Sequence, residues 1–301
     1  MGQVLCYRGC KSLLFFSVLG LLFFSSCRST QSFTSPLPEE YSIRMSKSSA
    51  SGYKNVKRVR KYEFVHRDVP AAFDGCRLGF VSDLHYRSLL KEKGLRDITR
   101  LLNDLHLDAL LIGGDLHEGC EYVPDVIAAL GAVKTPLGTY AVLGNNDYEA
   151  CYDDILKEME RQGIHLLEHE ADTLKRNGGR IVIAGVRNPF NLGQNGQSPT
   201  LSLSPDDFVI LLSHTPDYAE DVPITNTDLV LAGHTHGGQV TLFGLYAPVI
   251  PSRYGQRFLT GLRYNSNNTP IIITNGIGTS RKNVRLFAPS EVVVITLRRL
   301  K

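Results

Sequence analysis

Seven polar side chains in this sequence follow short apolar runs, at positions where a buried strand would end. They are Asp83, His85, Asp115, Asn145, His214, His234 and His236. Because ligands gather at the carboxyl ends of strands in α/β folds, we expect these groups to converge on one rim. Imidazole, carboxylate and amide donors without a thiolate suit Mn, Fe or Zn better than a soft metal. Seven donors exceed the needs of one tetrahedral ion and fit two ions about 3.5–4 Å apart.

The elements that would hold these donors alternate between buried strands and amphipathic helices. Strands are predicted directly before the donors at residues 78–81, 108–112, 140–143, 208–212 and 228–232. Apolar runs and helical spacing predict further strands at 180–184, 270–274 and 291–296, and helices at 95–105, 123–130 and 155–161. The turn-rich stretches 188–205 and 246–268 are expected to be loops over the site.

Length and composition describe an ordinary globular chain. The 301 residues are 43% hydrophobic and 21% charged, with a formal net charge of +3. These values exclude full disorder, a collagen-like fibre and a multi-span membrane protein. Six cysteines are too few for a disulfide scaffold in so long a chain. The charge is uneven, because residues 1–67 carry 11 basic and 3 acidic side chains (+8) and residues 68–301 carry 22 and 27 (−5).

The amino-terminal segment is predicted to target the protein to a membrane. An apolar run at residues 12–26 follows Arg8 and Lys11, and it is shorter than the roughly 20 residues that span a bilayer. The run ends in Phe24-Ser25-Ser26-Cys27, which resembles a bacterial lipoprotein cleavage box with Cys27 as the lipidated residue. Residues 1–27 are therefore interpreted as a signal peptide or an uncleaved membrane anchor, and both alternatives stay open.

Residues 28–63 are predicted to form a basic, serine-rich linker that buries no core. Its basic cluster consists of Lys54, Lys57, Arg58, Arg60 and Lys61. This cluster could lie on anionic lipid or remain a solvated linker face. Nucleic-acid binding is not expected, because no aromatic platform accompanies the cluster. Residues 64–301 are predicted to form one catalytic domain.

Five motifs occur in the order typical of a known family. They are Asp83-Leu84-His85, Gly114-Asp115, Gly144-Asn145-Asn146-Asp147, the lone His214 and Gly233-His234-Thr235-His236. Over about residues 76–298 this arrangement resembles the calcineurin-like metallophosphoesterases. The stretches 233–239, 252–255 and 275–280 are similar to a bacterial branch of exported or membrane-bound members.

The resemblance implies an α+β fold, a four-layer αββα sandwich, with a binuclear metal centre. It implies that Asp83, His85 and His236 hold one metal, that Asn145, His214 and His234 hold the other, and that Asp115 bridges them. The implied cofactors are two divalent ions, with manganese preferred over iron or zinc. The implied reaction is attack by a metal-bound hydroxide on a phosphorylated small molecule or a lipid-linked substrate.

Asn146 stands where the family usually has a histidine that contacts the phosphate and can protonate the leaving group. An amide gives up no proton at neutral pH but can hydrogen-bond a phosphoryl oxygen. General-acid help contributes about 10²–10⁴-fold when the leaving group is poor. Asn146 therefore favours a pyrophosphate linkage or an activated ester over an alkyl phosphodiester. His117 is the second candidate catalytic residue, because it lies near the site in Asp115-Leu116-His117-Glu118.

These features together predict a membrane-tethered, two-metal phosphohydrolase at the bacterial inner membrane. The specific hypothesis is hydrolysis of the pyrophosphate in UDP-2,3-diacylglucosamine during lipid A biosynthesis, which requires the cytoplasmic face. The alternatives are an exported phosphodiesterase acting on a cell-envelope phosphodiester and a metal-binding protein with little catalysis. Cys76, Cys120 and Cys151 are interpreted as core or surface thiols, because none has metal-ligand spacing to another.

Overall fold

Two β-sheets form the centre of the computed structural model, which describes residues 41–301. The predicted signal peptide or anchor, with Cys27, lies outside the described residues. The first sheet has seven strands in the order β1 (Tyr41–Ser49), β2 (Arg58–His66), β13 (Glu291–Arg299), β3 (Arg77–Val81), β4 (Ala109–Ile112), β5 (Thr139–Ala141) and β6 (Ile164–Leu166). The second has six in the order β11 (Gly261–Tyr264), β12 (Pro270–Ile273), β10 (Leu229–Ala232), β9 (Val209–Ser213), β8 (Gly179–Gly185) and β7 (Glu170–Arg176).

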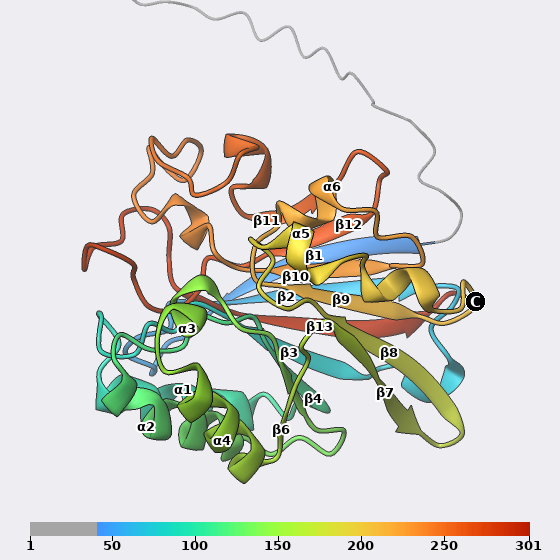
Figure 1. Cartoon of the computed structure of the whole chain (residues 1–301), viewed down its shortest axis with the longest axis horizontal. Helices are drawn as coiled ribbons and strands as arrows, with labels where there is room; N and C mark the ends of the chain where they lie inside the picture. Colours follow the sequence, from blue (N-terminus) through green and yellow to red (C-terminus); the bar gives the residue numbers. More distant parts are fainter. Residues whose placement is uncertain (1–40) are drawn as a thin grey trace, which may run out of the picture. The chain divides into compact units, whose positions relative to one another are not determined.

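Helices cover the outer faces of both sheets (Figure 1). The helices are α1 (Glu92–Asp104), α2 (Val123–Gly131), α3 (Asn145–Glu149), α4 (Tyr152–Gln162), α5 (Leu192–Asn195) and α6 (Tyr218–Asp221). One buried apolar cluster unites residues of both sheets, a second packs the first sheet against α1, α2 and α4, and a third packs the second sheet against α6. This is the predicted four-layer αββα sandwich of the α+β class, which the structure confirms.

The strand register explains why the donors meet at one edge. In the first sheet β3, β4 and β5 are parallel, with Val81 opposite Ile112 and Ile112 opposite Ala141. In the second sheet β9 and β10 are parallel, with Ser213 opposite Ala232. Strands that end level with one another release their following residues at the same edge. The predicted rim is therefore built from both sheets.

The linker prediction for residues 28–63 is wrong from residue 41 onward. β1 and β2 pair antiparallel over their whole lengths, and β2 also pairs parallel with β13. Tyr62 and Phe64 are buried in the cluster between the two sheets. The basic residues concealed that β2 is a buried strand, because one of them, Arg60, is itself buried. Its Nη2 lies 3.0 Å from the nearer carboxylate oxygen of Glu291, which is fully buried. The domain therefore begins before residue 64.

The remaining elements follow the predicted pattern with shifted ends. The predicted helices 95–105, 123–130 and 155–161 correspond to α1, α2 and α4. The expected loop 188–205 contains α5, and the expected loop 246–268 contains β11, which pairs antiparallel with β12. None of the helices in residues 41–301 is long and apolar enough to cross a bilayer.

Candidate metal centre

The first donor cluster joins two segments far apart in the sequence. Asp83 and His85 follow β3, and His236 follows β10; one donor atom from each lies within 4.8 Å of the others. The Nε2 atoms of His85 and His236 are 3.2 Å apart, and Asp83 Oδ1 is 3.4 Å from His236 Nε2. All three residues are buried. Two imidazoles and a carboxylate converging in this way are a three-ligand set for a divalent ion.

The second donor cluster lies beside the first. It contains Asp115, His214 and His234, whose donor atoms also lie within 4.8 Å of one another. His234 Nδ1 is 3.2 Å from His214 Nε2. Asp115 Oδ2 is 3.4 Å from His214 Nε2 and also 3.4 Å from His85 Nε2 in the first cluster. One carboxylate oxygen thus lies between both sets, where a bridging ligand of two ions would be.

Asn145 supplies an independent test of whether these residues fit metals. Its Oδ1 is buried and accepts no hydrogen bond, whereas its Nδ2 donates to Asn146 Oδ1 over 2.8 Å. A buried acceptor without a donor costs about 1–3 kcal/mol unless another partner takes its lone pair. A cation in the second cluster would be such a partner, so the donor set fits a metal. The structure therefore brings six of the seven predicted ligands together in two clusters, and the role of Asn145 as a metal ligand stays a prediction.

Carboxylate and carbonyl groups outside the clusters orient two of the imidazoles. His85 Nδ1 is 2.6 Å from Glu118 Oε1, and His214 Nδ1 is 2.7 Å from the carbonyl oxygen of Gly113. Such partners hold the Nδ1 proton and leave Nε2 free to bind a metal. Glu118 was not among the predicted site residues. Its position three residues after Asp115 was the only available signal.

Asp147 supports the site through hydrogen bonds that its place in the motif did not predict. Its carboxylate is fully buried and accepts from the backbone N–H groups of Asp115 (2.7 Å), Leu116 (3.0 Å) and Gly144 (2.9 Å). It therefore joins the segment after β4 to the start of α3, where Asn145 lies. The signal was its place as the last residue of Gly144-Asn145-Asn146-Asp147.

Most of the donors have an unusual backbone conformation. Positive φ angles occur at Asp83 (53°), His85 (41°), Asp115 (55°), His234 (66°) and His236 (52°). Each non-glycine residue in the left-handed region costs about 1–3 kcal/mol and is retained where the surrounding structure enforces it. Gly144 lets its backbone lie close to Asp115, because a Cβ at position 144 would overlap the Asp115 carboxylate. The conformation aims the side chains at the centre at a cost in stability.

The pKa values of the donors are shifted in different directions by burial and by their neighbours. Burial favours the neutral form of Asp115, but the adjacent His214 and His85 hold the pKa of its carboxyl well below the usual range. Burial alone would lower the pKa of His214, yet the Asp115 carboxylate raises it to about 10. Burial and the nearby His214 lower the pKa of His234 to about 3. The polypeptide thus presents an anionic bridge flanked by imidazoles of differing basicity.

The two predicted catalytic residues lie in different surroundings. The backbone N–H of Asn146 donates to Asp115 Oδ1 (3.0 Å), and its Nδ2 lies 3.3 Å from His85 Nδ1, so Asn146 borders both clusters. His117 is buried, its Nδ1 accepts from the N–H of Gly119 (3.1 Å), and its Nε2 lies 3.8 Å from Asp147. The contacts of His117 thus support the segment that carries Asp115. Its catalytic role stays a prediction.

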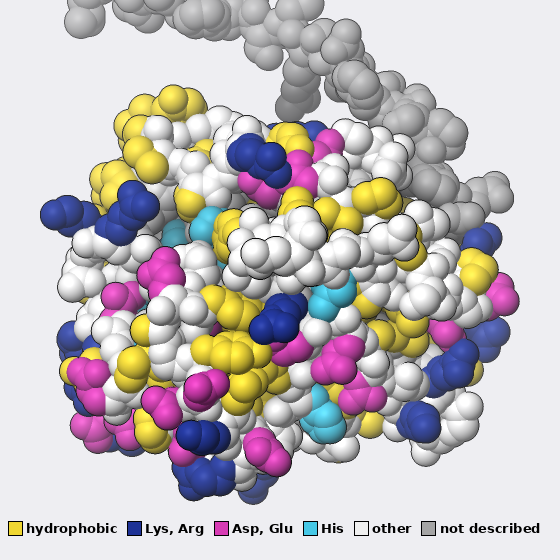
Figure 2. Space-filling model, in the orientation of Figure 1, with side chains coloured by type: hydrophobic (Ala, Val, Ile, Leu, Met, Phe, Trp, Pro, Cys, Tyr) yellow, Lys and Arg dark blue, Asp and Glu magenta, His cyan; other side chains and the backbone are white. Residues whose placement is uncertain are grey.

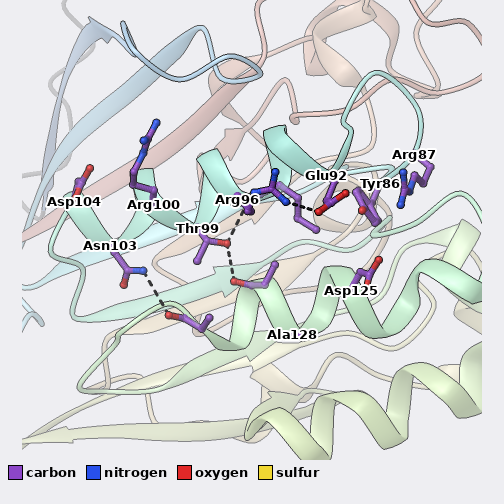
Figure 3. A pocket seen from close by; sticks show the side chains of 13 residues that line it. Tyr86, Arg87, Glu92, Arg96, Thr99, Arg100, Asn103, Asp104, Asp125 and Ala128 are labelled. Carbon is purple, nitrogen blue, oxygen red and sulfur yellow. Dashed lines mark hydrogen bonds and ion pairs between the residues drawn. The ribbon is translucent and has the colours of Figure 1, made fainter.

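Two hollows lie on the described surface near these segments. A groove of about 700 Å³ between α1 and α2 is lined by charged side chains of both signs, including the Arg96–Glu92 ion pair (Figure 3). A pocket of about 670 Å³ includes His234 in its lining, together with Phe190, Tyr218 and Arg253. The Phe190 ring lies 5.1 Å from that of His234. The second hollow therefore adjoins the donors and is the candidate substrate pocket.

The interpretation of Cys120 and Cys151 as thiols is wrong, because they form a disulfide. Cys120 lies two residues after Glu118, and Cys151 follows α3, so the bond links the two segments that Asp147 also joins. The spacing of 31 residues gave no signal of this pairing. Cys76 is a buried thiol as predicted, and burial raises its pKa to about 12.

Removing this disulfide should lower stability measurably. In the chain-entropy account, a bond closing 31 residues contributes about 3–4 kcal/mol to the free energy of unfolding. We expect Cys120→Ser/Cys151→Ser to lose about this amount in urea denaturation, and reductant to have the same effect on the unsubstituted protein. Reductant should leave the double variant unchanged. Identical unfolding midpoints with and without reductant would contradict the assignment.

The fold and the paired donor clusters define a metal-dependent phosphoester hydrolase. The sequence profile of the calcineurin-like phosphoesterases matches residues 76–238. The chain therefore belongs to this family, as the resemblance implied.

Relatives share the domain over most of its length. The chain is 30% identical to the uncharacterized metallophosphoesterase YkuE of Bacillus subtilis over 236 residues, which are 76% of this chain and 82% of that protein. It is 28% identical to an uncharacterized metallophosphoesterase of Aquifex aeolicus, covering 80% and 92% of the two chains. A dimetal phosphatase from Danio rerio resembles the structure with a TM-score of 0.40 at 14% identity, covering 69% of this chain and 90% of that one.

Proposed function

We propose that this protein is an exported, two-metal phosphohydrolase that cleaves a phosphoester or pyrophosphate bond in a cell-envelope substrate. The observation that carries the proposal is the position of Asp115 Oδ2, 3.4 Å from an imidazole nitrogen of each donor cluster. When bound there, two divalent ions would polarise the phosphoryl group and lower the pKa of the attacking water. Nitrogen and oxygen donors without sulfur suit manganese, iron and zinc. Manganese is the first metal to test, with iron and zinc as the alternatives.

The chain's own residues would position the substrate. The Asn146 amide borders both clusters and would donate a hydrogen bond to a phosphoryl oxygen. The pocket beside His234 would take the remainder of the substrate, with the exposed ring of Phe190 as one wall and Arg253 at its lining. Because the Asn146 amide supplies no proton, the leaving group must depart as a stable anion.

The disulfide supports the exported face of the membrane. Disulfides persist in oxidising compartments and are rare in the cytoplasm, and Cys120–Cys151 lies next to the centre. An exported enzyme at the bacterial inner membrane meets envelope pyrophosphates and activated phosphoesters, which suit Asn146, rather than cytoplasmic nucleotides. UDP-2,3-diacylglucosamine remains the second candidate substrate, because its nucleotide leaving group suits Asn146. It requires the cytoplasmic face, which the disulfide disfavours.

Changing the leaving group tests the proposal. We expect the unsubstituted enzyme, loaded with manganese, to hydrolyse bis(p-nitrophenyl) phosphate much faster than an alkyl phosphodiester. Asn146→His should raise kcat on the alkyl ester by about 10²–10⁴-fold, because a general acid helps a poor leaving group. It should change the rate on the nitrophenyl ester little. Equal gains on both esters, or none on either, would contradict the proposed role of Asn146.

The second candidate substrate has its own assay. Release of UMP from UDP-2,3-diacylglucosamine by the manganese-loaded enzyme would favour the cytoplasmic reaction. Hydrolysis of a lipid-linked pyrophosphate of the cell envelope without UMP release would support the exported enzyme. Absence of metal-dependent hydrolysis on either class, with metal bound, would favour the metal-binding alternative.

A further inference from the structure

Eight large apolar side chains on two loops near the metal centre are exposed. Their exposed fractions lie between 46% and 83%, and they are Leu242, Phe243, Leu245, Tyr246, Val249, Val284, Leu286 and Phe287. We call these eight residues the rim patch. Single exposed apolar residues are common on protein surfaces, whereas a contiguous group of this size marks an interaction surface.

The two loops form one ordered surface. The N–H of Thr241 donates to the carbonyl of Leu286 (3.0 Å), and the N–H of Leu286 donates to the carbonyl of Gln239 (2.9 Å). The rings of Phe243 and Phe287, one from each loop, lie 5.4 Å apart. The apolar side chains are therefore held outward together by backbone hydrogen bonds.

The charged side chains of the segment that holds the patch are all basic. Residues 229–290 contain no Asp or Glu and six Arg or Lys, whereas residues 68–301 as a whole carry a net charge of −5. Arg281 and Lys282 are exposed next to the patch. Figure 2 shows apolar side chains gathered at the upper left, over the loops that follow β10 in Figure 1, with basic side chains beside them. The surface complements an apolar phase bordered by anions.

The rim patch is connected directly to the metal centre. Its first loop begins three residues after His236 and leads to Pro251, which lines the same pocket as His234. Arg285, between two patch residues, donates to the carbonyl of His236 (3.1 Å) and to that of Asn275 (2.7 Å). These contacts place the patch beside the donors.

We propose that the rim patch inserts into the interface of an anionic lipid bilayer and holds the metal centre against the lipid head groups. The aliphatic and aromatic tips gain by leaving water, and the adjacent basic side chains gain from the negative surface potential. A second copy of the chain is disfavoured as the occupant, because self-association would bring Arg281 and Lys282 of both copies together. That a lipid-linked pyrophosphate or activated phosphoester at this surface is also the substrate rests on the proposed function.

The absence of tryptophan from the chain allows a direct test. In the full-length protein, Phe243→Trp places a single reporter in the patch, and Met45→Trp, at a half-exposed apolar site on β1, is the matched control. With vesicles of phosphatidylglycerol and phosphatidylcholine, we expect a blue shift and quenching by brominated lipid at position 243 only. Vesicles of phosphatidylcholine alone should give a weaker signal.

Disruptive variants complete the test. Arg281→Glu/Lys282→Glu, and separately Leu245→Asp/Phe287→Asp, should weaken the vesicle response of the Phe243→Trp reporter at least about tenfold, because each double variant removes two contacts with the bilayer. Hydrolysis of soluble bis(p-nitrophenyl) phosphate should be unchanged, which separates this proposal from the proposed function. An unshifted reporter on protein that sediments with the vesicles would overturn the proposal. Concentration-dependent dimerisation without lipid, abolished by Leu245→Asp/Phe287→Asp, would also overturn it.

Discussion

Asp115→Asn should reduce metal-dependent hydrolysis by about 10³-fold or more. The substitution removes the charge of the one oxygen that lies 3.4 Å from both His85 Nε2 and His214 Nε2, so it weakens both metal positions at once. Loss of a single electrostatic contact at a reacting centre already costs about 10²–10³-fold. The fold should persist, because the asparagine can still accept the 3.0 Å hydrogen bond from the N–H of Asn146.

The measurement combines turnover of bis(p-nitrophenyl) phosphate with bound metal determined by mass spectrometry. Asp97→Asn is the matched control, because Asp97 is also a largely buried carboxylate that lies outside the donor clusters. Its partners are Arg100 on α1, with 2.9 Å between Oδ1 and Nη2, and the N–H of Lys54, which donates to Oδ2 over 3.2 Å. The control should retain activity and metal content. Full activity in Asp115→Asn would show that the carboxylate does not bridge two ions.

Asp147→Ala should be the most destabilising single substitution around the site. It leaves the N–H groups of Asp115, Leu116 and Gly144 buried without an acceptor. Each such donor costs about 1–3 kcal/mol, so we expect the free energy of unfolding to fall by roughly 3–9 kcal/mol. That is a large part of the roughly 5–15 kcal/mol that stabilises a typical domain.

Urea denaturation gives the free energy, and titration of the folded variant with manganese gives the effect on metal binding. Asp147→Asn is the informative second variant, because one carbonyl oxygen can still accept from Asp115 and Gly144, both of which now bond to Oδ2. It should recover much of the stability. A loss below about 1 kcal/mol in the alanine variant would mean that other groups or water satisfy these donors.

The predicted site agreed with the structure where local pattern decides the outcome. An apolar run that stops at a metal-type donor marks a strand end without knowledge of the sheet, so Asp83, Asp115 and His214 could be found from the sequence. The parallel register of β3, β4 and β5 then brings those ends level, as expected.

The predictions that were wrong or incomplete concern residues whose partners lie far away in the sequence. The basic residues of β2 indicated a solvated linker, because the buried Glu291 that pairs with Arg60 lies 231 residues away. The sequence did not indicate that Cys120 and Cys151 pair, since a separation of 31 residues does not fix the distance between two side chains in the fold. Asp147 was visible as a motif residue, but its three backbone partners depend on how α3 packs against the segment after β4.

The sequence by itself determined the donor types, their order and the strands that end at them, because those depend on neighbours in the chain. Only the tertiary structure decided that the donors come from two sheets, that one oxygen of Asp115 lies between two clusters, and that Asp147 and a disulfide join the supporting segments. It also decided which apolar loop residues remain exposed beside the centre. The physical reason is that burial, pairing and convergence result from packing between residues distant in sequence, which periodicity along the chain does not encode.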